Sequence, residues 1–229
     1  MQDQNKTEKA NEAAGDRVND FIQRNRKVIF SVTGIILITF IGLVIFLSVK
    51  ENMDVKAAEK LEDLNRRYNE ISFQIGEEDS NADVSSLLAE LVEFAEKTKG
   101  LSGSKAWSLA AAIHSGREEW HEAEDAFLKA AKTGDRTYLG PVSLFNAAAA
   151  AEEQGKLDQA ISLLQECLAH KMEFPAAPRA QFSIGRLNEQ LGKNTDAIEA
   201  YRAVLINWPD MPVWPQLARS RIIAIEIAQ

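Results

Sequence analysis

Three side chains that could bind a metal lie close together in this 229-residue sequence: His114, Glu118 and His121. Imidazole nitrogens and carboxylates are common zinc ligands, but a zinc site needs a third or fourth ligand in tetrahedral geometry. The helical pattern places His114 at the end of one predicted helix, Glu118 in a turn and His121 at the start of the next helix. These three side chains need not converge. We therefore predict a packing role for His114, and no metal or other cofactor.

The sequence also lacks the motifs on which an enzyme would depend. It contains no glycine-rich phosphate loop, no G-x-S-x-G, no H-E-x-x-H and no C-x-x-C. The single cysteine, Cys167, occupies a position where two related segments have Ala130 and Val204, so we expect a small buried residue rather than redox chemistry. The glutamates at 118–119 and 152–153 are expected to be solvated surface. These patterns indicate a protein that is not an enzyme.

An apolar run without charge, from Val28 to Val49, interrupts the polar N-terminal region. Crossing a bilayer as a helix takes about 20 residues, whereas a signal peptide has an apolar core of about 7–15 residues. The run continues directly into Lys50, so it predicts an uncleaved transmembrane helix over 28–49 that contacts the lipid bilayer. Arg24, Arg26 and Lys27 precede it, which favours a cytoplasmic N-terminus and an exported C-terminal domain.

The charge is distributed unevenly along the chain. The net charge is -8, and residues 1–27 are slightly basic, so the excess of acidic side chains lies after the apolar run. An acidic domain is repelled by nucleic acid, and nucleic acid is therefore excluded as a partner. A single cysteine cannot form an intramolecular disulfide, which is compatible with an oxidising exported compartment. Residues 1–27 are polar throughout and are predicted to be a disordered cytoplasmic tail.

The region after the apolar run has helical periodicity throughout and no alternating strand pattern. Residues 50–103 predict a long helix and a second helix, which together form an opening hairpin ended by a loop at 100–103. Residues 104–209 then repeat three times with a period of 37 residues, and 210–229 predict a capping helix. Equivalent positions hold small residues, large residues or turn residues: Ala111, Ala148 and Gly185; Ala123, Ala160 and Ala197; Phe127, Leu164 and Tyr201; Glu118, Gly155 and Gly192.

This pattern resembles the tetratricopeptide repeat, most clearly in the third unit, where Gly185, Gly192, Ala197, Tyr201 and Pro209 recur in the expected order. The period is longer than the 34 residues of that family. The predicted fold class is all-α, with one N-terminal transmembrane helix followed by a tetratricopeptide-like α-hairpin solenoid and a C-terminal capping helix.

The layout of one anchor and one repeat domain is similar to the bacterial family of ancillary Sec-translocon subunits. That resemblance implies a single-pass protein of the bacterial inner membrane with a periplasmic domain. It also implies a non-enzymatic adaptor whose partners are proteins: translocon subunits, chaperones or exported clients. The alternative is a structural subunit of an envelope or cell-division assembly, in which the transmembrane helix makes the main contact.

The resemblance further implies that the first helices of the repeats line a groove that binds a partner. By register, the groove residues are Lys105, Phe145, Asn146, Arg179, Phe182 and Arg186. Phe145 and Phe182 are 37 residues apart and would hold an extended or helical peptide. Alternatively, both rings pack against the opening helix or the cap. A carboxylate clamp made by Asn146, Arg179 and Lys105 fits less well, because Ala112 stands where the clamp needs a polar side chain.

Overall fold

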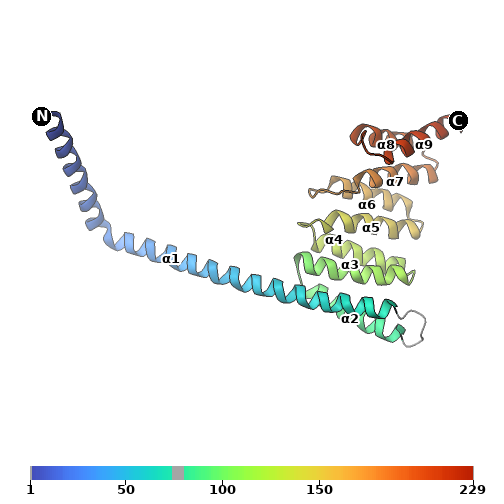
Figure 1. The fold of residues 1–229 in the computed structure, drawn as a ribbon, viewed down its shortest axis with the longest axis horizontal. Coiled ribbons are helices and arrows are strands. Elements are labelled where there is room, and N and C mark those ends of the chain that lie inside the picture. The colour runs from blue at the N-terminus through green and yellow to red at the C-terminus, as the bar shows by residue number, and fades with distance from the viewer. Residues whose placement is uncertain (1, 74–79, 229) are drawn as a thin grey trace. The chain divides into compact units, whose positions relative to one another are not determined.

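The computed structural model describes the backbone of residues 2–73 and 80–228, and the side chains of 23–71 (except Ile29) and 82–228. The chain divides into two compact units, Met1–Val55 and Lys56–Gln229. The described helices are α1 Gln2–Phe73, α2 Ser80–Lys97, α3 Gly100–Gly116, α4 Trp120–Thr133, α5 Leu139–Glu153, α6 Leu157–Ala169, α7 Ala177–Gln190, α8 Asn194–Asn207 and α9 Trp214–Ala228 (Figure 1). No strand occurs in this described part, and the all-α fold class is confirmed.

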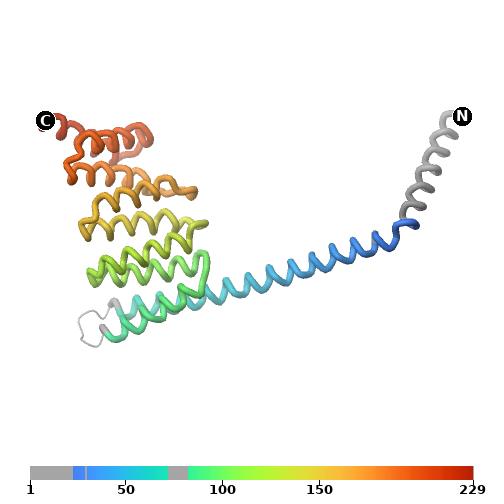
Figure 2. Tube along the Cα trace, turned by 180° about the vertical axis from the view of Figure 1, so that it is seen from behind, coloured from blue at the N-terminus to red at the C-terminus, as the bar shows by residue number. Residues whose placement is uncertain are grey.

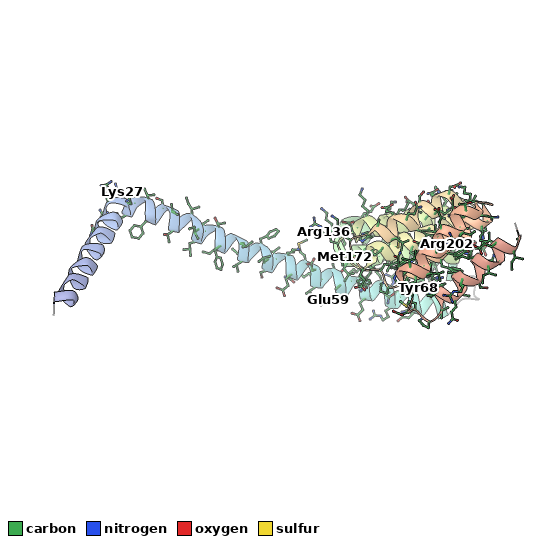
Figure 3. All side chains as sticks on the ribbon, turned by 90° about the horizontal axis from the view of Figure 1, so that it is seen from above. Lys27, Glu59, Tyr68, Arg136, Met172 and Arg202 are labelled. Carbon is green, nitrogen blue, oxygen red and sulfur yellow. The ribbon has the colours of Figure 1, made fainter. Side chains whose placement is uncertain are left out.

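The first unit consists of the N-terminal part of α1, and the apolar side chains that the structure describes there, from Val28 onward, are exposed. Phe30 is 77% exposed and Ile38 is 72% exposed. Side chains project outward from the ribbon of α1 between the labelled Lys27 and Glu59 (Figure 3). The helical segment Gln23–Ile71 contains an 18-residue window of mean hydropathy 2.8, and none of that window is buried. A helix of this length and composition is able to cross a membrane.

The polar segment 1–27 differs from the prediction of disorder. The structure begins α1 at Gln2 and describes the backbone of 2–27 as helix. Alanine, glutamate, glutamine and lysine are frequent in this segment, and all four are good helix formers. Their intrinsic preference for helix accounts for the difference, since the sequence prediction considered only the lack of apolar residues to bury.

The second unit is a row of helices in which each helix from α2 to α9 contacts the next one in the chain (Figures 1 and 2). The opening hairpin consists of the 56–73 part of α1 together with α2. Leu64 on α1 is fully buried with Leu87 and Leu91 on α2. Arg67 donates from Nη1 and Nη2 to the Glu90 carboxylate, at 2.8 and 3.0 Å. The predicted opening hairpin is therefore present.

The small residues that recur every 37 positions lie where helices approach most closely. Ala123, Ala160 and Ala197 are all fully buried. Gly185 is the extreme case, since a Cβ added there would lie 2.5 Å from the ring of Tyr201. The small side chains allow close packing within each hairpin, as the repeat pattern predicts.

The turns inside the three hairpins share one backbone conformation. Gly155 and Gly192 have φ values of 72° and 71°, and Glu118 at the equivalent position has φ 60°. Glycine adopts this left-handed region without steric cost, whereas a residue with a Cβ is strained there. The predicted equivalence of Glu118 with the two turn glycines is therefore confirmed by its conformation.

The segment 100–103, predicted as a loop, is instead the first turn of α3. Gly100 has φ 68°, which turns the chain sharply after α2. Gly103 lies against the backbone carbonyl of Thr98 so closely that a Cβ would collide with it. The glycines thus permit a tight helix-to-helix connection, and the pattern was wrong in treating them only as helix breakers.

The C-terminal cap is a single helix, α9, packed on α8. Ala218, Ile222 and Ile225 of α9 are buried in one cluster with Tyr201 and Val204 of α8. The remaining face of α9 has no helix after it in the described chain.

Candidate protein-binding face

The first helices of the hairpins form one face of the repeat unit, which we call the first-helix face: residues 56–73 of α1, and α3, α5, α7 and α9. Along this face α3 contacts α5, and α7 contacts α9. Ser108 Oγ on α3 lies 3.5 Å from Ser143 Oγ on α5. Direct contact between first helices is what places them on the inner side of a curved repeat array.

A cleft of about 610 Å³ lies on this face between α1 and α3. Leu61 of α1 and Leu109 of α3 are half-buried in it, and Leu101 at the start of α3 is 40% exposed. Its lining is completed by small and polar residues: Ala58, Glu62, Asn65, Ser102, Lys105, Ser108 and Ala112. A concave apolar surface with a few polar groups at its edge has the composition of a binding site.

The predicted groove residue Lys105 lies in this cleft, and its side chain is exposed. Lys105 and Glu62 are the two charged residues of the lining. They give the cleft one positive and one negative group beside its leucines. The cleft can therefore pair with both signs of charge on an otherwise apolar partner segment.

Phe145 and Arg179 are brought together by the fold. The Arg179 guanidinium lies 5.1 Å from the centre of the Phe145 ring, which is a cation–π distance. Phe174, in the connection between α6 and α7, lies 5.5 Å from the same ring. Phe145 is therefore half-buried, with Phe174 on its ring and an exposed Arg179 above it.

Phe182 is also half-buried, but in the cap. Its ring lies 5.0 Å from that of Tyr201 and 5.5 Å from that of Trp214 on α9. The sequence left open whether Phe182 lines the groove or packs against the cap, and its ring does pack against the cap. That Phe145 and Phe182 bind a partner stays a prediction.

Arg186 and Asn146 have different surroundings. Arg186 donates from Nη1 and Nη2 to the Glu152 carboxylate at 2.5 and 2.6 Å, which joins α7 to α5. These hydrogen bonds raise the pKa of Arg186 above its usual range. Asn146 is half-buried on α5. Because Glu152 accepts this bidentate pair, it is not merely solvated surface as predicted.

A buried carboxylate that the sequence prediction missed joins α4 to the next hairpin. Glu124 is 4% exposed and accepts hydrogen bonds from Gln154 Nε2 at 2.7 Å, Lys156 Nζ at 3.2 Å and Gln159 Nε2. A buried charge is stable only when it is paired and hydrogen-bonded in this way. Its signal in the sequence was indistinct, since Glu124 lies among other acidic residues of one helix.

The candidate metal ligands do not form a site. His114 Nδ1 lies 2.6 Å from Glu119 Oε2, across the turn that Glu118 occupies. Within the described ranges, no group of three or more His, Cys, Asp and Glu side chains could hold a metal ion. The contact also shows that Glu119 is paired, which differs from the solvated surface expected for it.

Cys167 is buried, as its place in the repeat predicts. It is 1% exposed, and its Sγ donates to the carbonyl oxygen of Pro141 at 3.2 Å. Burial raises the pKa of the thiol to about 12. A thiol that stays protonated at neutral pH is a poor nucleophile, so Cys167 contributes packing rather than chemistry.

The cleft residues Leu61, Leu101 and Leu109 were missed as site residues. Leu61 fits the apolar stripe of its helix, so the pattern assigned it to the core. Leu101 was placed in a loop, because the two glycines around it were interpreted as the end of the hairpin. The apolar character of Leu101 beside those glycines was the signal that could have identified it.

Comparison with known proteins agrees with this geometry. Residues 145–212 match the family described as Tetratricopeptide repeat. A TPR repeat-containing protein of Treponema pallidum is 37% identical over 128 residues, which cover 56% of this chain and 53% of that protein. Residues 145–212 are thus similar to tetratricopeptide repeats, and the helical solenoid has a tetratricopeptide-like fold. The chain spans about half the length of the curated relative that it matches.

The tetratricopeptide-repeat fold also occurs in a solved structure of similar arrangement. TPR-like repeats assigned to a kinesin light chain of Podosopora anserina align with a TM-score of 0.51, 15% identity, and coverage of 74% of this chain and 85% of that chain. At this identity the likeness concerns the fold alone. Tetratricopeptide-repeat domains typically act as non-enzymatic scaffolds that bind proteins, and no catalytic family is indicated.

Proposed function

We propose that this protein is a single-span membrane adaptor of the bacterial cell envelope, whose exported tetratricopeptide-repeat domain binds a protein partner in the α1/α3 cleft. The partner is a secretion-translocon subunit, an envelope chaperone or an exported client. The observation that carries the proposal is the cleft itself, which combines the exposed Leu101 and two half-buried leucines with Lys105 and Glu62 on the first-helix face.

The chemistry of the cleft favours an amphipathic segment as its ligand. Leu101, Leu61 and Leu109 offer apolar contact to one side of a helix or to alternate residues of an extended peptide. A cleft of about 610 Å³ accommodates a few side chains of such a segment rather than a whole domain. The partner therefore needs one apolar stripe flanked by polar residues.

The membrane part of the proposal is supported by α1. Its described apolar side chains between Val28 and Val49 are exposed in the first unit, and burying them in lipid would remove them from water. Arg24, Arg26 and Lys27 at one end favour that end in the cytoplasm. The domain after the segment would then lie in the periplasm.

Topology is tested by labelling a single exposed cysteine. Cys167 is replaced by alanine, Ser162→Cys provides an exposed thiol on α6, and cells with an opened outer barrier receive a membrane-impermeant maleimide. Labelling in intact cells is expected for an exported domain. Labelling that occurs only after lysis of the inner membrane would place the domain in the cytoplasm and contradict the proposal.

Partner binding is tested by photo-crosslinking from the cleft in native membranes. A photoreactive residue at Ser102, which also lines the cleft, is expected to capture a defined partner, while the same residue at Ser162, outside the cleft, is the matched control. Leu101→Asp combined with Lys105→Glu should then reduce capture of that partner by about tenfold, because truncating anchor contacts typically costs 1–3 kcal/mol.

The alternative of a structural subunit makes the opposite prediction. If the transmembrane helix is the main contact, the cleft variants retain every partner. Replacing 28–49 by an unrelated apolar span would then abolish assembly. That pair of results would overturn the cleft proposal.

A further inference from the structure

A second groove, of about 760 Å³, lies along the second helices α6 and α8, with α7 at its floor. The helices α6, α7 and α8 follow one another in the row (Figure 1). Ile161, Ile184 and Ala200, one from each helix, are buried at the floor. Four exposed charged side chains stand at the rim: Asp158, Lys193, Asp196 and Glu199. This groove shares no residue with the α1/α3 cleft.

The equivalent space one repeat earlier is filled by side chains of the chain itself. There the buried Glu124 accepts hydrogen bonds from Gln154, Lys156 and Gln159. The residues 37 positions after these four are Ile161, Leu191, Lys193 and Asp196, and all but Leu191 line the groove. Isoleucine thus replaces the buried carboxylate, and the Lys193 ammonium pairs instead with Asp158, 2.7 Å away at the rim. The groove is a position of the repeat that this chain leaves open.

A buried amide at the floor offers an acceptor to a ligand. Asn188 is 6% exposed, and its Nδ2 donates to the carbonyl oxygen of Ile184 at 2.9 Å. Its Oδ1 accepts no hydrogen bond from the described chain, although every fully buried side-chain N or O atom of the described residues has a partner. This oxygen is therefore reached from the groove that Asn188 lines. The preceding repeat has Ala151 here, so packing does not require the amide.

The charges at the rim define the ligand that fits. Because Asp158 and Lys193 neutralise each other, Asp196 and Glu199 give the groove a surplus of two negative charges. These two lie three residues apart on α8, which places them one helical turn apart on the same side. The carboxylates and the Asn188 oxygen are all acceptors. A ligand therefore has to supply positive charge and hydrogen-bond donors.

We propose that this groove binds a basic segment of a partner protein. Lysine or arginine side chains of the segment pair with Asp196 and Glu199, an apolar side chain between them covers Ile161 and Ile184, and an N–H group donates to Asn188 Oδ1. The volume lies within the range of about 300–1,000 Å³ that is usual for ligand sites, so the groove takes a few side chains rather than a folded domain. The site is separate from the α1/α3 cleft and does not depend on the function proposed for it.

The separation of the two sites is itself testable. Ser162, the control position for the cleft, lies in the lining of this groove. A photoreactive residue at Ser162 should therefore not capture the partner that is captured from Ser102. The same protein crosslinked at both positions would contradict two separate sites.

Binding is measured with the purified full chain in nonionic detergent and two fluorescent peptides of about 12 residues, or roughly three helical turns. The basic peptide has leucine at every third or fourth position and lysine or glutamine elsewhere. In the acidic peptide, glutamate replaces each lysine. The unsubstituted chain should bind the basic peptide in preference to the acidic one by fluorescence anisotropy. No binding of the basic peptide, or equal binding of both, would overturn the proposal.

Charge reversal at the rim locates the binding. Asp196→Lys with Glu199→Lys should weaken binding of the basic peptide by about tenfold and strengthen that of the acidic peptide, because two attractive pairs become repulsive. Glu122→Lys with Glu166→Lys changes the net charge equally at exposed positions outside the groove and is the matched control. Its affinity should stay within about twofold. An equal loss in both double variants would show only attraction to the net charge and would refute the groove.

Two variants of the floor complete the test. Asn188→Ala, which copies Ala151, should weaken binding of the basic peptide by about threefold to fivefold while thermal unfolding stays cooperative. Ile161→Glu with Leu191→Gln and Asp196→Gln copies the side chains around Glu124 and should close the groove, with Lys193 already in place. Thermal unfolding establishes that this closed variant is folded. Undiminished binding by the folded closed variant, or by Asn188→Ala, would contradict the proposed contacts.

Discussion

The substitution Gly185→Ala tests the packing that defines the repeats. The added methyl group would lie 2.5, 2.7 and 2.8 Å from three atoms of the Tyr201 ring. That ring cannot move aside easily, because Tyr201 is fully buried and its hydroxyl donates to Glu189 at 2.6 Å. The Phe182 ring, 5.0 Å away, supports it from the side.

The magnitude follows from two opposing effects. Overpacking typically costs 1–3 kcal/mol, and three contacts under 3 Å with a fixed ring place this case at the upper end. Alanine gains about 1 kcal/mol over glycine in a helix interior. The net destabilisation is therefore about 2 kcal/mol, which lowers Tm by about 4–8 °C for a domain of this size. The matched control is Gly116→Ala, where the same methyl group enters open space and should not destabilise.

The sister repeat supplies a rescue. Ala148 and Leu164 occupy the positions equivalent to Gly185 and Tyr201. Tyr201→Leu should therefore make room for the alanine, so the double variant should be no less stable than Tyr201→Leu alone. Thermal unfolding with hydrogen exchange of α7 and α8 measures all four chains. If Gly185→Ala matched Gly116→Ala, or if the two effects simply added, the packing argument would be wrong.

Three further predictions concern single positions. Glu118→Gly should stabilise the domain by about 0.5–1 kcal/mol, because a left-handed residue loses its Cβ strain, whereas Gly155→Ala should cost about 1–2 kcal/mol; denaturant unfolding compares the two. Burial by itself would raise the pKa of Glu189, but hydrogen bonds led by that from Arg221 lower it below 4.5. The charged Glu189 carboxylate therefore stabilises the folded chain above its unfolded-state pKa, and this stabilisation is lost as the pH falls through the lower folded-state pKa. When unfolding is measured against pH, a Glu189→Gln variant should lack this acid-sensitive part of the stability. Cys167, with a thiol pKa of about 12, should react with a thiol reagent only in denaturant, and rapid modification of the native chain would contradict its burial.

The sequence by itself determined the helical repeat architecture. Regular spacing of Ala123, Ala160 and Ala197 reports close packing within each hairpin, because only a small side chain fits there in every repeat. The turn positions of Gly155 and Gly192 can also be predicted from the sequence, since their left-handed conformation depends on the local backbone. Glu118 could be aligned with them by spacing alone, and its φ of 60° agrees. The apolar run at 28–49 can be recognised from the sequence as well, because it depends only on consecutive residues.

The position of the first turn of α3 could not be predicted in this way. Glycine is compatible both with a helix end and with close backbone contact, and the choice depends on what lies opposite. At Gly103 that neighbour is the carbonyl of Thr98. Because the sequence prediction took these glycines as a helix end, it placed Leu101 in a loop and did not identify it as a cleft residue.

The tertiary structure alone decided which predicted groove residues are accessible. Arg186 could have faced a ligand, but it pairs with Glu152, 34 residues earlier in the chain. Phe182 lies against Trp214, whereas Lys105 remains exposed beside the α1/α3 cleft. Periodicity places a side chain on a face of its own helix. Its partner comes from a neighbouring repeat, and the contact between repeats exists only once the helices are stacked.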